Sequence, residues 1–381
     1  MALRIAMVAG EASGDLLGAH LIGALRQKLP DCRFYGIGGP KMQREGLEAW
    51  WPAEKLAVRG YAEVLRHYRE ISGIRRRLIT RLLDDRPDVF IGVDAPDFNL
   101  AVEARLKANG IPAIHYVGPS IWAWRGGRVK KIGRSVSRIL AMFPFEPEIY
   151  ERHQIPVTYV GHPLADILPM AVSKVAARER LDLPAAQTIF ALLPGSRQSE
   201  LHFMADMFIE TARRLHEDFP AALFLVPLVS RETRNQFEVA LWKLGAQELP
   251  IKMLFGHAQD ALAAADCALV ASGTATLEAA LLKTPHVIAY RMSPWSWQLM
   301  KRMRYQAWVG LPNILAKRFV VPEFLQDEAT PENLSQALGT LLVDTTVRQR
   351  MENIFSDMHR QLQQGTAEKA AQAILPYLHA A

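Results

Sequence analysis

The sequence predicts an α/β protein made of two doubly wound, Rossmann-like domains that face each other across a central cleft. Short runs rich in β-branched and aromatic residues alternate with longer amphipathic stretches, a pattern typical of parallel sheets with helices on both faces. Several of the short runs have apolar residues at consecutive positions, as strands buried on both faces do. The chain has 381 residues, which exceeds the size at which one core usually divides into two domains.

Eleven runs are predicted as strands, six in the first half of the chain and five in the second. Helix-like segments fill most of the intervals, and the residues downstream of 330 indicate helices only. The interval at 161–175 contains Pro163 and Pro169, and we place the domain boundary there, between 168 and 169. The predicted strands cover 4–10, 32–38, 88–94, 112–118, 138–144, 157–161, 188–195, 221–227, 251–256, 267–273 and 286–292.

Composition and charge narrow the class of protein. Half of the residues are hydrophobic and 22% are charged, which indicates a packed core and excludes a disordered chain. The net charge of +6 fits an anionic small molecule, an anionic membrane surface or nucleic acid equally well. No run approaches the ~18 apolar residues that span a bilayer, and an acidic residue comes too early for a signal peptide. Cys32 and Cys267 are expected to be reduced and buried.

The turns after the strands form the candidate site, because ligands of doubly wound sheets bind beyond the carboxyl ends of the strands. The first turn, VAGEASGD (8–15), offers the backbone amides of Ser13 and Gly14 to a phosphate or a sugar. The alternative is a turn without a ligand, in which Ser13 and Asp15 cap the next helix. The glycine spacing is not GxGxxG, which disfavours a dinucleotide-dependent oxidoreductase.

The second turn, GVDAPDFN (92–99), follows a buried run and carries two acids. A carboxylate at the end of a buried strand is costly unless it has a partner or a chemical task. Asp94 is therefore predicted to act as a general base on a bound hydroxyl, and Asp97 to cap the following helix. His115 stands at another strand end, and the residues alone leave His115 and Asp97 open as the base.

The third turn, LLPGSRQSE (192–200), has the parts of an anion site. Gly195 lets the backbone approach an anion, Ser196 adds a hydroxyl, and Arg197 can make the bidentate contact that phosphates favour. The Gly-Lys-Ser/Thr of a nucleoside triphosphatase loop is missing. A diphosphate held by arginine and amides, without an essential metal, is therefore expected.

A fourth turn, ASGTATLE (271–278), follows the strand predicted at 267–273. Ser272, Gly273 and Thr274 make the turn, and Glu278 lies one helical turn further on the same side. Glu278 is predicted to accept hydrogen bonds from the hydroxyls of a ribose; the alternative is a first-turn glutamate favoured by the helix dipole. The third and fourth turns together predict a site for a nucleoside diphosphate.

The segment 61–83 is basic and amphipathic. Its apolar residues fall near one helical face, and six arginines accompany them, among them Arg75, Arg76 and Arg77. Such a helix is typical of an element that lies on a membrane surface. The alternative is an ordinary surface helix whose apolar side covers the core.

Taken together, six segments resemble the lipid A disaccharide synthase family of Gram-negative bacteria. They run in family order from residue 8 to 316, and GEASGD combined with SIWAWR is highly specific, whereas SGT or PGSR alone is weak. The resemblance implies an inverting glycosyltransferase of the two-domain GT-B fold. The six segments are VAGEASGD, GVDAPDFN, HYVGPSIWAWR, LLPGSRQSE, ASGTATLE and LPNILA.

The resemblance also implies the reaction. The chain would transfer 2,3-diacylglucosamine from its UDP carrier to 2,3-diacylglucosamine 1-phosphate (lipid X), giving a β-1,6-linked disaccharide and UDP. The acceptor would belong to domain 1–168 and the nucleotide to domain 169–350, with the helices of 351–381 packed back on the first domain. The resemblance makes Asp94, Arg197 and Glu278 functional positions, with Ser13, Gly14 and Asn313 on the acceptor side; on spacing alone Asn313 is only a turn residue.

The sequence and the resemblance also lead to expectations about binding partners, location and alternative functions. No cofactor, metal or nucleic acid is expected, and the oligomeric state stays open. Acylated substrates favour the membrane-surface interpretation of 61–83, and hence a cytoplasmic protein bound peripherally to the inner face of the inner membrane. A UDP-sugar 2-epimerase of the same architecture is the alternative enzyme, and a non-catalytic acyl-sugar carrier is the alternative from another class.

Overall fold

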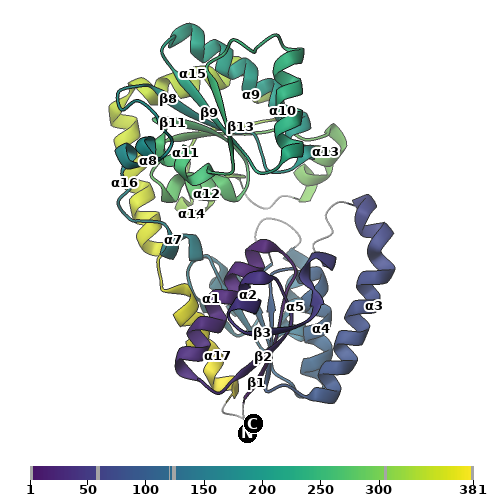
Figure 1. Cartoon of the computed structure of the whole chain (residues 1–381). Helices are drawn as coiled ribbons and strands as arrows, with labels where there is room; N and C mark the ends of the chain where they lie inside the picture. The colour runs from purple at the N-terminus through teal and green to yellow at the C-terminus, as the bar shows by residue number, and fades with distance from the viewer. Residues whose placement is uncertain (1–2, 57–60, 120, 122–125, 304–306, 379–381) are drawn as a thin grey trace. The chain divides into compact units, whose positions relative to one another are not determined.

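The computed structural model describes the chain except residues 1–2, 57–60, 120, 122–125, 304–306 and 379–381. It divides into two compact units (Figure 1). Unit 1 comprises residues 1–166 and 362–381, and unit 2 comprises residues 167–361. The first division falls two residues before the boundary that the sequence predicts. The prediction that the chain returns to the first domain at 351 is wrong, because residues 351–361 belong to unit 2.

Unit 1 is a doubly wound parallel sheet. Over its described residues, the strand order is β3-β2-β1-β4-β5-β6-β7, so the chain moves outward from β1 in one direction and from β4 in the other. The strands are β1 (Arg4–Ala9), β2 (Arg33–Gly38), β3 (Leu47–Pro52), β4 (Val89–Val93), β5 (Ala113–Tyr116), β6 (Arg138–Ala141) and β7 (Val157–Tyr159). The helices are α1 (Ala12–Lys28), α2 (Pro40–Arg44), α3 (Tyr61–Asp85), α4 (Pro96–Ala108), α5 (Val129–Ser135), α6 (Glu146–Glu151), α7 (Pro163–Ile167) and α17 (Thr366–Leu378), with short 3₁₀ turns at Ala53–Lys55 and Gly126–Arg128.

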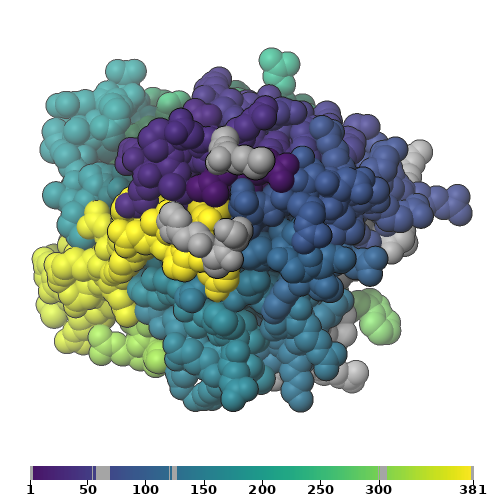
Figure 2. Space-filling model, turned by 90° about the horizontal axis from the view of Figure 1, so that it is seen from below, coloured from purple at the N-terminus to yellow at the C-terminus, as the bar shows by residue number. Residues whose placement is uncertain are grey.

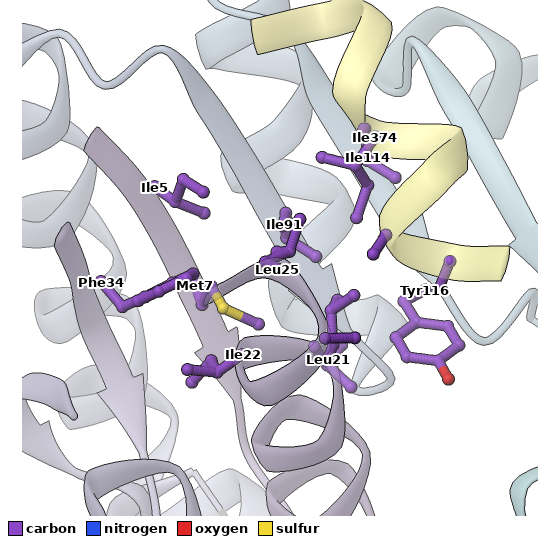
Figure 3. Close-up of a cluster of buried hydrophobic side chains, with 14 of the residues drawn as sticks. Ile5, Met7, Leu21, Ile22, Leu25, Phe34, Ile91, Ile114, Tyr116 and Ile374 are labelled. Carbon is purple, nitrogen blue, oxygen red and sulfur yellow. The ribbon is translucent and has the colours of Figure 1, made fainter. Parts of the chain in front are cut away.

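One face of this sheet packs against α1 and the C-terminal helix α17. Alternate strand residues, such as Ile5, Met7 and Ile91, meet Leu21 of α1 and Ile374 of α17 in one buried cluster (Figure 3). In Figure 2 the last helix (yellow) lies directly against the N-terminal segment (purple). The C-terminal segment therefore supplies part of the core of unit 1.

Hydrogen bonds anchor α17 where the chain leaves and re-enters unit 1. The carboxylate of Asp166 accepts the backbone amides of Gly365 at 3.0 Å and Thr366 at 2.6 Å, which are orphan donors at the start of α17. The amide of His162 donates to the carbonyl of Leu362 at 2.9 Å. Gly161 has a φ of 88°, and a Cβ there would lie 2.6 Å from the same carbonyl oxygen, so the close approach requires glycine.

The other face of the sheet is covered by α3 and α4. Ile74, Leu78 and Leu82 of α3 are buried in the cluster that also contains Phe90 and Val102. The second half of the predicted basic amphipathic segment therefore turns its apolar side to the core, as the alternative interpretation expects. The side chains of residues 61–68, including the apolar positions at the start of that segment, lie outside the described residues.

Unit 2 repeats the doubly wound plan. The order of its described strands is β10-β9-β8-β11-β12-β13, and α9, α10 and α15 pack together, while α11 contacts β8 and β9. The strands are β8 (Ile189–Leu193), β9 (Leu223–Leu228), β10 (Ile251–Phe255), β11 (Cys267–Ala271), β12 (His286–Tyr290) and β13 (Glu323–Leu325). The helices are α8 (Lys174–Arg180), α9 (Gln198–Asp218), α10 (Arg231–Lys243), α11 (Ala258–Ala264), α12 (Thr274–Leu281), α13 (Pro294–Met303), α14 (Leu311–Ala316), α15 (Pro331–Val343) and α16 (Thr345–Leu362), with a 3₁₀ turn at Gln326–Glu328.

Asp266 ties α8 to the sheet of unit 2. Its carboxylate accepts the ammonium of Lys174 at 2.8 Å, the guanidinium of Arg178 at 3.0 Å and the amide of Ile189 at 2.9 Å. Burial by itself raises the pKa of this carboxyl, but the hydrogen bonds and the two cations outweigh burial and hold the pKa below 3.8. The ionised form is therefore the one that stabilises the fold.

Asp266→Asn is expected to lower the free energy of unfolding at neutral pH by about 1–3 kcal/mol, because it leaves buried donors without an ionised acceptor. The contribution of a carboxyl whose folded pKa is depressed is present above its ordinary pKa of 3.8 and is lost as the pH falls through the folded pKa. Urea unfolding at pH 7 and at steps below pH 3.8 checks this. An equal difference between variant and wild type at every pH would contradict it.

Candidate active site

Asp94 lies at the switch point of the sheet in unit 1, where ligands of doubly wound sheets bind. It follows β4, and β4 pairs with β1. The two turns adjoin: a Cβ at Gly10 would lie 3.5 Å from the Cβ of Ala95, and a Cβ at Gly14 would lie 3.5 Å from the carbonyl oxygen of Val93. The structure thus brings together two of the turns that the sequence singles out.

The backbone holds Asp94 in an unusual conformation. Asp94 has a φ of 52° and Ala95 a φ of 45°, both in the left-handed region that non-glycine residues seldom adopt. The amide of Asp94 donates to the carbonyl of Tyr116 at 2.8 Å, and the Asn99 side-chain amide donates to the carbonyl of Asp94 at 2.8 Å. Such strain is kept where the surroundings over-determine it, most often at functional sites. The side chain of Asp94 is partly exposed.

The caps predicted for α1 and α4 are wrong. Asp15 is buried in the first turn of α1, and its carboxylate accepts the amides of Lys41 and Met42, each at 3.0 Å, so it caps α2 instead. Ser13 is exposed in that same turn, and Gly14 is buried against β4. The N-cap of α4 is Ala95, and Asp97 makes no capping bond.

The structure separates the three candidates for the base. The side chain of Asp97 is 86% exposed and pairs with Arg128 at 3.3 Å, whereas that of His115 is 0% exposed. The Nδ1 of His115 lies 2.7 Å from Oε1 of Glu103, which is also 0% exposed. Burial disfavours the imidazolium, but Glu103, and after it Asp94, outweigh burial and raise the pKa of His115. Asp94 alone of the three is both partly exposed and at the switch point.

The two predicted nucleotide turns are neighbours in unit 2. β8 pairs with β11 through Leu193 and Val270, so the turns that follow them stand side by side at the switch point of this sheet. Gly195 has a φ of 125° and Gly273 a φ of 140°, which only glycine adopts without strain. The two anion-competent turns therefore share one edge of the sheet.

Part of the predicted diphosphate loop is occupied by the protein itself. Oε2 of Glu200 accepts the amides of Ser196 at 2.9 Å and Arg197 at 3.2 Å, so these two donors are not directed to an anion. This corrects part of the expectation that arginine and the amides of this loop hold a diphosphate. Within the described part of the chain, the next two amides, of Gln198 and Ser199 at the start of α9, donate no hydrogen bond.

The side chain of Arg197 is available at the same edge. It is 60% exposed, and its guanidinium lies 3.6 Å from Oε1 of Glu200, beyond hydrogen-bonding distance. The hydroxyl of Ser196 is exposed beside it. A cation, a hydroxyl and the N-terminus of a 21-residue helix together make a site for an anion.

Glu278 is a partly buried carboxylate on α12. Burial raises its pKa, and no hydrogen bond or ion pair holds it among the residues that the structure describes. Ser272 and Thr274 frame the same turn: Ser272 is partly exposed and Thr274 is exposed. A carboxylate that loses solvation without gaining a protein partner is suited to a ligand that donates hydrogen bonds, such as a ribose.

Asn313 does not present its side chain as the sequence analysis expected. It is 0% exposed on α14, its Oδ1 accepts the amides of Val320 at 2.7 Å and Val321 at 2.8 Å, and its Nδ2 donates to Val321 and Glu323. Glu323 in turn accepts the amides of Val309 and Gly310, each at 2.9 Å. Asn313 therefore organises the loop of residues 309–323 instead of facing the acceptor.

Three functional candidates were missed in the sequence. Glu200 stands three residues after the helix N-cap, the position of a capping glutamate, and this spacing could have indicated that it takes amides of the loop. Asn99 and Glu103 lie on the buried side of α4 with Val102 and Leu106. Polar residues in an apolar stripe are the signal that could have found them. The two tryptophans of the segment HYVGPSIWAWR, Trp122 and Trp124, lie outside the described residues.

Comparison with known proteins identifies the family. The model of the lipid-A-disaccharide synthetase family matches residues 5–375. A lipid-A-disaccharide synthase of Dechloromonas aromatica (strain RCB) is 62% identical to the chain over 379 residues, 99% of each protein. The chain belongs to the lipid A disaccharide synthase family. It is therefore a glycosyltransferase, and the 2-epimerase alternative is not favoured.

Solved structures show the fold that this family member shares. The UDP-GlcNAc 2-epimerase of Neisseria meningitidis bound to UDP-GlcNAc superimposes with a TM-score of 0.61 at 12% identity, covering 100% of both chains. CalG4, the calicheamicin glycosyltransferase, gives a TM-score of 0.60 at 16% identity, covering 100% of this chain and 99% of the other. The two sheets and these likenesses establish the GT-B fold of two Rossmann-like domains.

Proposed function

We propose that this member of the family transfers 2,3-diacylglucosamine from UDP-2,3-diacylglucosamine to lipid X, with inversion at the anomeric carbon and release of UDP. The observation that supports this most is the pair of switch points. One presents a strained, partly exposed aspartate, and the other presents two adjacent glycine turns with an arginine and an unpaired glutamate. A base in one unit and a nucleoside diphosphate site in the other are what this transfer needs.

Each residue has a role in this proposal. Asp94 takes the proton from the acceptor's 6-hydroxyl as that oxygen bonds to the anomeric carbon and the bond from this carbon to the diphosphate oxygen breaks. Arg197, with the amides of Gln198 and Ser199, stabilises the charge that grows on the departing UDP. Glu278 accepts hydrogen bonds from the ribose, and Ser272 and Thr274 line its turn. Ser13 and Gly14 belong to the acceptor side.

The experiment that tests this function is incubation of the chain with UDP-2,3-diacylglucosamine and lipid X, with the products identified by mass. Disaccharide 1-phosphate and UDP are expected, and UDP release should require lipid X. Release of UDP without lipid X, or an epimerised nucleotide sugar, would favour epimerase chemistry. Binding of both lipids with no product would favour a carrier.

Glu278→Gln is expected to weaken UDP binding by about tenfold or more, because a charged acceptor makes the stronger hydrogen bonds to hydroxyls. Burial raises the pKa of Glu278, so the ionised acceptor disappears at a higher pH than for an ordinary glutamate. Wild-type affinity for UDP should therefore fall as the medium becomes mildly acidic, and the variant should show less of this fall. Calorimetric titrations across that range check both statements; equal affinities would contradict the ribose role.

We also propose that the exposed arginines of α3 bring the protein to an anionic membrane surface on the cytoplasmic side, where acylated substrates reside. Arg76 and Arg77 are exposed, while Arg75 donates to the carbonyl of Asp97 at 3.3 Å. None of the described helices is long and apolar enough to cross a membrane. A surface contact through α3 would use the charge of the helix, since its described apolar side chains serve the core.

The double variant Arg76→Gln/Arg77→Gln is expected to weaken binding to vesicles containing phosphatidylglycerol by about 2 kcal/mol, roughly 30-fold, at ~1 kcal/mol for each basic residue. Vesicle pelleting at low and high salt measures this, and pure phosphatidylcholine vesicles give the baseline. Arg33→Gln/Arg44→Gln removes two exposed charges elsewhere in unit 1 and serves as the matched control. Equal pelleting of both double variants would contradict a role for α3.

A further inference from the structure

We propose that Glu103 and His115 are positioning residues for Asp94: Glu103 holds the imidazolium of His115, and this positive charge keeps the Asp94 carboxylate ionised and ready to accept a proton. This inference rests on the assignment of Asp94 as the base. It assigns a task to two side chains that the reaction itself does not touch, because neither is exposed to a substrate.

The strand register places His115 beside the last residues of β4, close to the backbone of Asp94. Gly92 of β4 is the partner of His115 on β5. Phe90 and Gly92 face the same side of the sheet, and Phe90 belongs to the cluster covered by α3 and α4. Asp94 lies just beyond the end of β4, two residues after Gly92, and its amide donates to the carbonyl of Tyr116, the residue that follows His115.

Gly92 keeps room for the carboxylate of Glu103. A Cβ at Gly92 would lie 2.2 Å from Oε1 of Glu103 and 2.9 Å from the Cβ of Asn99, distances that real Cβ atoms do not show. The strand thus has glycine at the one position where a side chain would displace Glu103 from His115. A simple apolar core at this place would not need that gap, because a Cβ would fill it.

The pair is costly as a structural feature. Both side chains are 0% exposed, and within the described residues Nε2 of His115 and Oε2 of Glu103 have no hydrogen-bond partner. A buried pair of charges is often no more stabilising than an apolar pair of the same size. Ionisable groups held in this way are therefore candidates for a functional role when they stand beside a reactive group.

The charges acting on His115 come from two carboxylates, Glu103 on α4 and Asp94 after β4. The cations on the elements packed around it have other partners. Lys107 of α4 donates to the carbonyls of Gly133 and Val136, and Arg138 of β6 donates to Thr158 at 2.6 Å. Arg105 of α4 and Lys131 and Arg134 of α5 are exposed. Glu146 is buried, and its carboxylate accepts the amides of Met142 and Phe143.

The effect on Asp94 follows by reciprocity. Burial opposes the charged imidazole, but Glu103 and Asp94 raise the pKa of His115, so a carboxylate at Asp94 favours the imidazolium. By linkage the imidazolium favours the carboxylate by the same free energy. Burial also raises the pKa of Glu103, and His115 opposes that rise. Without His115, Asp94 would lose the positive charge that favours its carboxylate.

The test measures kcat/KM against pH, by UDP release from UDP-2,3-diacylglucosamine and lipid X. His115→Asn and Glu103→Gln should each move the acidic limb of the profile to higher pH by about one unit, and the double variant should move it no further, because the pair acts as one group. His286→Asn is the matched control: His286 is also 0% exposed, but it bonds to the carbonyl of Thr284 in unit 2. His286→Asn should lower the free energy of unfolding but leave the acidic limb of the pH profile at its wild-type position.

A second measurement leaves the buried pair itself unchanged. In ¹⁵N-histidine-labelled wild type, His115 should stay protonated above its ordinary pKa of 6.5, and Asp94→Asn should lower its titration midpoint. The pair would have only a structural role if two results came together. His115→Asn and Glu103→Gln would lose turnover equally at every pH, and Asp94→Asn would leave the titration midpoint of His115 unchanged. If His115→Asn lost all activity while Asp94→Asn kept it, the assignment of Asp94 as the general base would itself be overturned.

Discussion

Replacing Asp94 with asparagine is expected to lower kcat by about 10²–10⁴-fold, the usual contribution of a general base. Asparagine keeps the size of the side chain and can keep its backbone bonds to Tyr116 and Asn99, so the fold should survive. The affinity for UDP should stay at the wild-type value, because the nucleotide turns belong to unit 2. Steady-state kinetics and calorimetric titration of UDP measure the two quantities separately.

Asp97→Asn is the matched control for this prediction. Asp97 lies three residues further along the same turn, its side chain is 86% exposed, and it pairs with Arg128 at the surface. Its loss should change turnover little, since exposed ion pairs contribute about 0–1 kcal/mol. If both variants lost turnover equally, Asp94 and Asp97 could not be assigned different roles. If Asp94→Asn lost UDP binding, Asp94 would instead be a residue of the nucleotide site.

Arg197→Ala is expected to reduce kcat by about 10²–10³-fold, the cost of removing one preorganised donor from a site where charge develops. Arg197 is the N-cap residue of α9, directly before the amides of Gln198 and Ser199, and its guanidinium has no hydrogen-bonded partner in the described residues to hold it elsewhere. Arg197→Lys should recover part of the loss, because the charge returns but the bidentate geometry does not.

Arg214→Ala controls for the loss of a cation from the same helix. Arg214 lies near the other end of α9 and pairs with Glu332, away from the glycine turn. Single-turnover measurements with saturating donor separate chemistry from binding. If Arg197→Ala raised KM alone and left the single-turnover rate unchanged, Arg197 would bind the ground state only, and leaving-group stabilisation would have to come from the amides.

The strands of both sheets could be predicted because most are buried on both faces. Each of the eleven predicted runs overlaps a strand of the structure, as the continuous apolar segments of β4 and β8 illustrate. The two missed strands are edges. β3 has exposed Glu48 and Ala49 in its middle, and β13 spans only Glu323–Leu325, so neither shows the pattern of a buried strand.

Parts of the candidate site could be predicted from the sequence where the backbone geometry requires a particular residue type. Gly195 and Gly273 adopt angles that only glycine tolerates, and Asp94 ends a strand at the switch point, so strand ends and glycines were sufficient signals. Side-chain partners across the fold could not be predicted. Asp15 caps a helix 26 residues away in sequence, and Asn313 folds its own loop, because hydrogen bonds of this kind depend on tertiary placement.

The most direct measurement is hydrogen–deuterium exchange of the full chain with and without UDP. If the paired turns of unit 2 bind the nucleotide, UDP should protect the amides of 195–201 and 272–278, above all Gln198 and Ser199, and leave 8–18 and 92–99 unchanged. Protection of 8–18 or 92–99 with none at 195–201 would place the nucleotide in unit 1 and contradict the proposed division of labour.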